Sequence, residues 1–245
     1  MTKIQSITKE LKNFGSLERA KHSLRFFKTG PGQYGAGDIF YGASVPEMRI
    51  VSRKYKDTDL DDVQGLLKNK YHECRLVALM ILVEKYARAE RLKNDSEMKK
   101  YYEMYLNNTR YINNWDLVDL SAHKIVGAYL YNKDEHGKNR DRSILYKLAK
   151  SSDLWEKRIS IISTYYFIYR NDFNDTLKIS EMLLTDKHDL IHKAVGWMLR
   201  EVGKRDQNVE EEFLKKHYQT MPRTMLRYAI EKFDEKKKKF YMNKG

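Results

Sequence analysis

The residues best suited by type and spacing to take part in a chemical reaction lie in the stretch Trp115-Asp116-Leu117-Val118-Asp119. Asn113 and Asp116 are typical of a helix start, because an Asn side chain caps free amides and an acid in the first turn complements the helix dipole. In that helix, Trp115 and Asp119 are four residues apart and share one face. A carboxylate supplies negative charge and can orient water, and an indole offers a π face. The pattern fits a functional site made of an indole and a carboxylate. It fits equally a core Trp beside a solvated Asp.

A second tryptophan, Trp197, falls on a basic helix face. At 100° per residue from Lys193, Trp197 lies at about 40°, Arg200 at about 340° and Lys204 at about 20°. The apolar side chains of the same helix cluster near 190°, namely Val195, Met198, Leu199 and Val202. A Trp among cations is expected where a base, a sugar or a phosphate backbone is contacted. Packing of this Trp against a neighbouring helix is the alternative.

The elements that must hold these residues form a succession of helix pairs. One polar position recurs in the second helix of each pair, at separations of 44, 39, 35 and 34 residues: Arg75, Asp119, Arg158, Lys193 and Arg227. These periods are typical of α-helical repeats of HEAT type, in which the second helices line one concave surface. The four cations would form a row that follows a phosphate backbone, with Arg158 emerging from the first turn of its helix. A chance alignment in a chain rich in Lys and Arg is the alternative.

Composition supports an all-α fold for the whole chain. Of 245 residues, 41% are hydrophobic and three are proline. We expect one α-helical repeat domain over residues 1–245, with N-terminal helices and a glycine-rich loop in 1–43, HEAT-like repeats in 44–235 and a solvated basic tail in 236–245. The solenoid should carry a concave basic groove, because a net charge of +13 favours an anionic partner. A DNA-binding groove is expected ahead of a membrane-binding one, although charge alone does not choose between them.

Several other functions find no support in the sequence. The single cysteine, Cys74, fits a reducing cytoplasm and cannot form an internal disulfide framework. Gly30-Pro31-Gly32-Gln33-Tyr34-Gly35 matches a dinucleotide fingerprint in form only, since a helical pattern precedes it, and a loop between helices is expected instead. His188 and His192 have the spacing of metal ligands but no third ligand. We therefore expect no metal, no cofactor, no nucleotide and no membrane segment, and a cytoplasmic monomer.

Three dispersed motifs resemble those of the AlkD-like alkylpurine DNA glycosylases, which are built from HEAT-like repeats. They are Trp115-Asp116-Leu117-Val118-Asp119, Trp155-Glu156-Lys157-Arg158 and the segment from Lys193 to Glu201. Their order and separations are similar to those of the family, and the resemblance extends from about residue 20 to about residue 235.

The resemblance implies roles for individual residues. Trp115, Asp119 and Trp197 would act at the lesion, and Arg158 would fix a flanking phosphate. Phe26 takes the place of a tyrosine of the family, so stacking is kept and one hydrogen bond is lost. The expected additional DNA contacts are Lys193, Arg200, Lys204, Arg75 and Arg227.

The activity that the resemblance implies is hydrolysis of the N-glycosidic bond of cationic N-alkylated purines, of the 3-methyladenine or 7-methylguanine type. The substrate would be duplex DNA containing alkylated bases, and the enzyme would not need to flip the base. Relatives with this fold that bind distorted or branched DNA without excision provide the alternative. A HEAT-type protein scaffold is a third possibility, which predicts an apolar or acidic concave face.

Overall fold

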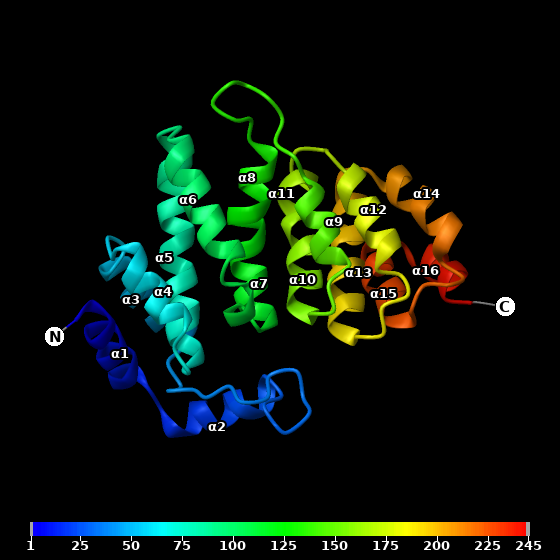
Figure 1. The fold of residues 1–245 in the computed structure, drawn as a ribbon. Coiled ribbons are helices and arrows are strands. Elements are labelled where there is room, and N and C mark those ends of the chain that lie inside the picture. Colours follow the sequence, from blue (N-terminus) through cyan, green and yellow to red (C-terminus); the bar gives the residue numbers. More distant parts are fainter. Residues whose placement is uncertain (1, 244–245) are drawn as a thin grey trace. The chain divides into compact units, whose positions relative to one another are not determined.

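The computed structural model describes residues 2–243, which fold into helices joined by turns and by two longer loops, 27–44 and 132–142 (Figure 1). No strand forms among them, and extended pairing is limited to one bridge between Ile39 and Tyr71. The all-α prediction is confirmed, and the succession of packed helices fits a helical-repeat solenoid. The chain divides into two compact units, one ending at Ile125 and the other beginning at Val126.

The first unit is built around α5 (His72–Arg91), which is buried along most of its length. Helices α3 (Val45–Lys54), α4 (Leu60–Leu67), α6 (Asp95–Leu106) and α7 (Trp115–Ala122) all pack against it. Helix α1 (Lys3–Phe14) packs on α3 and α4, and the remaining elements of the unit are α2 (Leu17–Phe26) and the short 3-10 helix η1 (Thr109–Tyr111). Ser44 and Glu47 form a capping box at the start of α3, with the Ser44 amide donating to Glu47 Oε2 at 2.6 Å. Their S-x-x-E spacing is the sequence signature of such a box.

The second unit continues the pairing of helices. The π-helical turn η2 (His123–Gly127) leads into α8 (Ala128–Tyr131), and the helices that follow are α9 (Ser143–Ala149), α10 (Leu154–Ser163), α11 (Tyr165–Ile168), α12 (Asn174–Met182), α13 (Asp189–Arg205), α14 (Gln207–His217), α15 (Arg223–Ala229), η3 (Ile230–Lys232) and α16 (Glu235–Met242). Helix α10 packs on α9 and α13, and α13 packs on α12, α14 and α15. The isoleucines of α10 are fully buried, as its apolar sequence predicts.

The recurring polar position has a constant structural place. It is the fourth residue of α5 and the fifth residue of α7, α10, α13 and α15. The alignment thus marks equivalent turns of five helices and is not a coincidence of composition.

Two local expectations need correction. The N-cap of α7 is Asn114, whose Oδ1 accepts from the amide of Trp115 at 2.8 Å, and not Asn113. The basic stretch near the C-terminus is helical, because Tyr241 is buried against Phe233 and Tyr218 and Lys237 pairs with Glu211. The aromatic ring of Tyr241 therefore anchors a segment for which the lysine-rich composition alone predicts a solvated tail.

Gly196 provides a test of the packing between α13 and α15. A Cβ at this position would lie 2.4 Å from the Met225 carbonyl oxygen and 2.6 Å from Tyr228 Cβ. Because backbone cannot move aside cheaply, we expect Gly196→Ala to lower the free energy of unfolding by about 2 kcal/mol or more, despite a gain in helix propensity of about 1 kcal/mol. Urea unfolding followed by circular dichroism measures the change.

Gly65→Ala in α4 is the matched control. There the added Cβ meets only the tip of the Ile4 side chain, which can rotate away. Gly65→Ala should be neutral or stabilising, and equal losses in both variants would contradict the close approach at Gly196.

Candidate functional site

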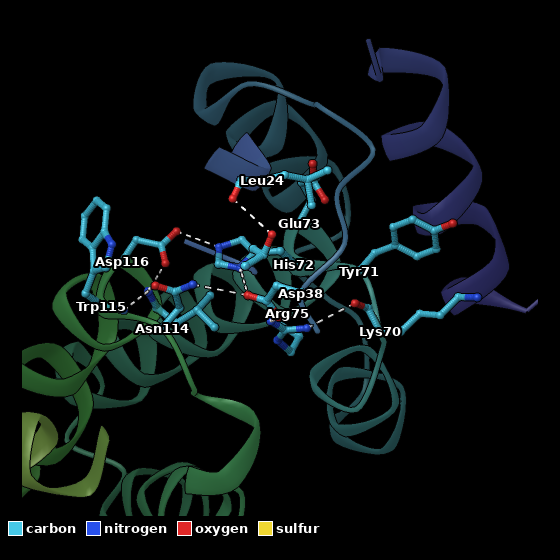
Figure 2. A network of polar contacts seen from close by, with 12 residues as sticks. Leu24, Asp38, Lys70, Tyr71, His72, Glu73, Arg75, Asn114, Trp115 and Asp116 are labelled. Carbon is cyan, nitrogen blue, oxygen red and sulfur yellow. Dashed lines mark hydrogen bonds and ion pairs between the residues drawn. The ribbon is translucent and has the colours of Figure 1, made fainter. Parts of the chain in front are cut away.

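A buried polar network fixes the start of α7, the helix that carries Trp115 and Asp119 (Figure 2). His72, the first residue of α5, is 2% exposed and bridges two carboxylates. Its Nδ1 lies 3.0 Å from Asp38 Oδ2, and its Nε2 lies 2.8 Å from Asp116 Oδ2. The imidazole therefore connects α7 to α5 and to the loop that contains Asp38.

Two further groups satisfy Asp38. Arg75 donates to its Oδ1, and Asn114 Nδ2 donates to its Oδ2 at 3.3 Å. Arg75 also donates to the carbonyl oxygen of Asn69 at 3.2 Å. A buried carboxylate is stable only when it is paired and hydrogen-bonded, and each of these donors meets that requirement.

The network carries formal charge. Burial alone would lower the pKa of His72, but the carboxylates of Asp116 and Asp38 outweigh it and raise that pKa to about 9. Burial alone would raise the pKa of Asp38, but the hydrogen bond from His72 and the charge of Arg75 lower it. At neutral pH the centre is thus an imidazolium held between two carboxylates.

Aromatic rings cover this network and orient Trp115. Phe27 and Phe40 each lie 4.9 Å from the His72 ring, measured between centroids. Phe27 stacks on Trp115 at 5.5 Å, and Phe26 makes an edge contact with the same indole at 5.8 Å. Trp115 is partly exposed and Phe26 is 55% exposed, so the two rings offer an accessible aromatic surface.

Asp119 lies one helical turn beyond Trp115 on α7 and is partly exposed. Burial, together with the negative charge of Asp119, raises the pKa of Tyr105. Burial and the nearby Lys124 lower the pKa of His123 to about 4, so this imidazole is neutral at pH 7 and brings no positive charge to Asp119. An indole and an anionic carboxylate on one face can stabilise a cation.

In the second unit, Trp197 is held by an acid. Its Nε1 donates to Glu201 Oε1 at 3.1 Å, and its ring lies 5.5 Å from that of Tyr165. The same Oε1 accepts from Lys204 Nζ at 2.7 Å and lies 3.5 Å from Arg200 Nη2. The predicted grouping of Trp197 with Arg200 and Lys204 is present, organised by a glutamate that is only 8% exposed.

The expected exposure of two arginines is wrong. Arg158 is 4% exposed and donates to the carbonyl oxygen of Leu190 at 2.5 Å, so it does not emerge from the first turn of α10. Arg75 is 5% exposed and belongs to the Asp38 network. Of the predicted row of cations, Arg227 is exposed, and Lys193 is partly exposed with an ion pair to Asp189 at 2.7 Å.

The glycine-rich segment 29–42 is a loop, as predicted, and it is docked on α5. Both carboxylate oxygens of Glu73 accept from its backbone, from Tyr41 N at 3.1 Å and Gly42 N at 2.7 Å. The loop supplies Asp38 and Phe40 to the centre. Within residues 2–243, no group of three or more metal-ligating side chains occurs. No helix in that range is long and apolar enough to span a bilayer.

The repeat alignment contained a signal for the buried network. His72 and Asp116 each lie three residues before the recurring polar position, Arg75 in one repeat and Asp119 in the next, and equivalent positions of stacked repeats lie next to each other. Their opposite charges could have suggested the contact. Nothing local to Asp38 indicates its partners, because a loop residue 34 positions before His72 is brought there only by folding.

The network predicts a specific dependence of stability on alkaline pH. The folded pKa of His72, about 9, lies above the ordinary value of 6.5, so its contribution is complete below pH 6.5 and is lost as pH rises through 9. In urea unfolding, wild-type stability should fall by up to about 3 kcal/mol over this range. His72→Gln should be less stable at pH 6.5 and lose much less stability towards pH 9.

Glu210 in α14 makes the variant comparison necessary. Burial raises the pKa of this carboxyl group to about 9, so it also destabilises the fold as pH rises. Only the difference in unfolding free energy between wild type and His72→Gln, followed over pH, isolates the contribution of the imidazolium. Parallel pH profiles for the two proteins would contradict its charged state.

Comparisons with known proteins agree with this architecture. No curated protein matches the sequence. A solved structure described as a predicted DNA alkylation repair enzyme from Enterococcus faecalis superimposes with a TM-score of 0.66 at 15% identity, covering 90% of this chain and 97% of the other. At that identity the likeness concerns the fold. Residues 7–233 match the profile of the family described as DNA alkylation repair enzyme, so the chain belongs to the DNA alkylation repair enzyme family.

Proposed function

We propose that this protein is a monofunctional DNA glycosylase that hydrolyses the N-glycosidic bond of cationic N-alkylated purines in duplex DNA. The observation that carries the proposal is the face of α7, where Asp119 follows Trp115 by one turn beside the exposed ring of Phe26. Membership of a DNA alkylation repair family makes DNA the expected substrate.

The chemistry suits these residues. Alkylation at N3 or N7 leaves the purine positively charged, so the bond from C1′ to the base breaks with its electron pair returning to the ring. Positive charge then develops on the deoxyribose. Water adds at C1′ and loses one proton, which the Asp119 carboxylate can accept and pass to solvent, to leave an abasic site. Asp119 would stabilise this charge and orient the water, and Trp115 would present its π face to the sugar.

The rigid support of Trp115 favours this role. Its ring stacks on Phe27, its amide is capped by Asn114, and the next residue, Asp116, is held by His72. A ring that is already held in place needs no rearrangement when the sugar becomes positively charged, so its interaction with that charge is gained at no reorganisation cost. An aromatic surface on a helix face suits a mechanism in which the base stays in the duplex, since no enclosed base pocket is then required.

In the second unit, Trp197 would offer an aromatic contact of its own to bound DNA. Its indole N–H is occupied by Glu201, so the ring face is the part left for DNA. Lys204 pairs with Glu201, and Arg200 pairs with both Glu201 and Glu231. We propose that the two cations exchange these carboxylates for phosphate on binding. Lys193 and Arg227 would add electrostatic contacts.

Asp119→Asn tests the proposal. The substitution removes one negative charge and keeps the shape of the side chain, so release of methylated purine from alkylated duplex DNA should fall on the order of 100-fold or more. Binding to the same duplex should stay unchanged or become slightly tighter, because an anion has been removed from the DNA-facing surface. Single-turnover base release and equilibrium binding are measured on the same preparation.

Asp61→Asn is the control, since Asp61 is an exposed aspartate in the first turn of α4. It should leave base release at the wild-type level. If wild-type protein binds methylated duplex and releases no base, the enzyme proposal fails. The chain would then be a non-catalytic binder of distorted or branched DNA.

A further inference from the structure

A basic pocket of about 550 Å³ is lined by residues of α3, α5 and α7 and of the turns that follow α3 and α7. Its walls carry the side chains of Arg49, Arg53, Lys56 and Lys124, with one carboxylate, Glu84. Apolar side chains of α5 and α7 contribute Met80, Val83 and Leu120 to the lining. Four cations therefore converge on one cavity with a single acid.

These four cations lack the protein partners that their neighbours have. Within residues 2–243, none of them forms an ion pair or a side-chain hydrogen bond. Other cations of the same unit are paired: Lys54 with Glu10 at 2.7 Å, Arg88 with Asp57 at 3.6 Å and Arg91 with Glu84 at 3.7 Å. The pocket is thus a place where the protein holds positive charge without neutralising it.

Grouping these charges costs stability. Arg49 and Arg53 are four residues apart on one side of α3, a spacing at which like charges repel. Burial and the charge of Arg49 lower the pKa of Lys124 on the next turn after α7. Such repulsion is relieved when an anion enters between the cations, so the arrangement favours an anionic ligand.

The pocket faces away from the indole of Trp115. At 100° per residue, Leu120 lies about 140° around α7 from Trp115 and about 100° from Asp119. The cavity lies over α5 and over the two helices that pack against it, α3 and α7. Two guanidinium groups can each bind phosphate oxygens in pairs, and the lysines add point charges.

We propose that this pocket binds phosphate groups, supplied by the sugar-phosphate backbone of duplex DNA that flanks the reacting nucleotide. Arg49, Arg53 and Lys124 would hold the phosphates, and the apolar lining would contact deoxyribose. The inference rests on the proposed function for its DNA source, but the phosphate chemistry follows from the pocket alone. The pocket also supplies exposed cations that can contact the DNA backbone in the first unit, where Arg75 is buried.

Arg53→Gln and Lys124→Gln test the site, with Lys54→Gln as the matched control. Lys54 is the next residue of α3, is also exposed and is paired with Glu10. Affinity for an undamaged duplex is measured from about 50 to 200 mM salt. Each pocket variant should reduce the steepness of log K against log salt by about 0.9 and weaken binding roughly five-fold near 150 mM, while Lys54→Gln should match wild type.

Two further outcomes separate this inference from the proposed function. If wild type binds duplex and releases base while the pocket variants match Lys54→Gln, the pocket assignment is overturned and the glycosylase stands. If wild type does not bind duplex, thermal stabilisation by pyrophosphate decides. Stabilisation that is lost in Arg53→Gln would support a pocket for a free phosphate compound, and no stabilisation of wild type would overturn the site.

Discussion

The arrangement of the first unit depends on the ion pairs that the imidazolium of His72 forms with Asp38 and Asp116. The imidazolium joins the N-terminus of α5, the N-terminus of α7 and the glycine-rich loop at one buried point. A charged group without partners could not remain there, because the cost of removing it from water is several kcal/mol. The two carboxylates, with Arg75 and Asn114, make the charged state the stable one.

This constraint decides how α7 presents its side chains. With Asp116 anchored inward, Trp115 and Asp119 point along the face that remains accessible, and Phe26 and Phe27 fix the plane of the indole. A comparable device operates in the second unit, where Glu201 gathers Trp197, Arg200 and Lys204. In both units an acid fixes the neighbourhood of a partly exposed aromatic residue, Asp116 beside Trp115 and Glu201 beside Trp197.

Much of the fold could be predicted from the sequence because helical repeats are local. Three features indicate the helices, and each depends on only one or two helices at a time. They are the period of the aligned position, the capping box at Ser44 and the scarcity of proline. Individual side-chain environments could not be predicted in the same way. Arg75 and Arg158 occupy the predicted turns, yet each finds a buried acceptor, Asp38 in one case and the Leu190 carbonyl in the other. Those partners are distant in sequence.

The reaction proposed for the face of α7 is cleavage of a glycosidic bond. It can be measured by incubating the wild-type protein with a duplex that contains 7-methylguanine, separating the released base by chromatography and assaying bound DNA in the same samples. We expect free 7-methylguanine and an abasic strand in equal amounts. A duplex that is bound and remains intact would contradict the proposal.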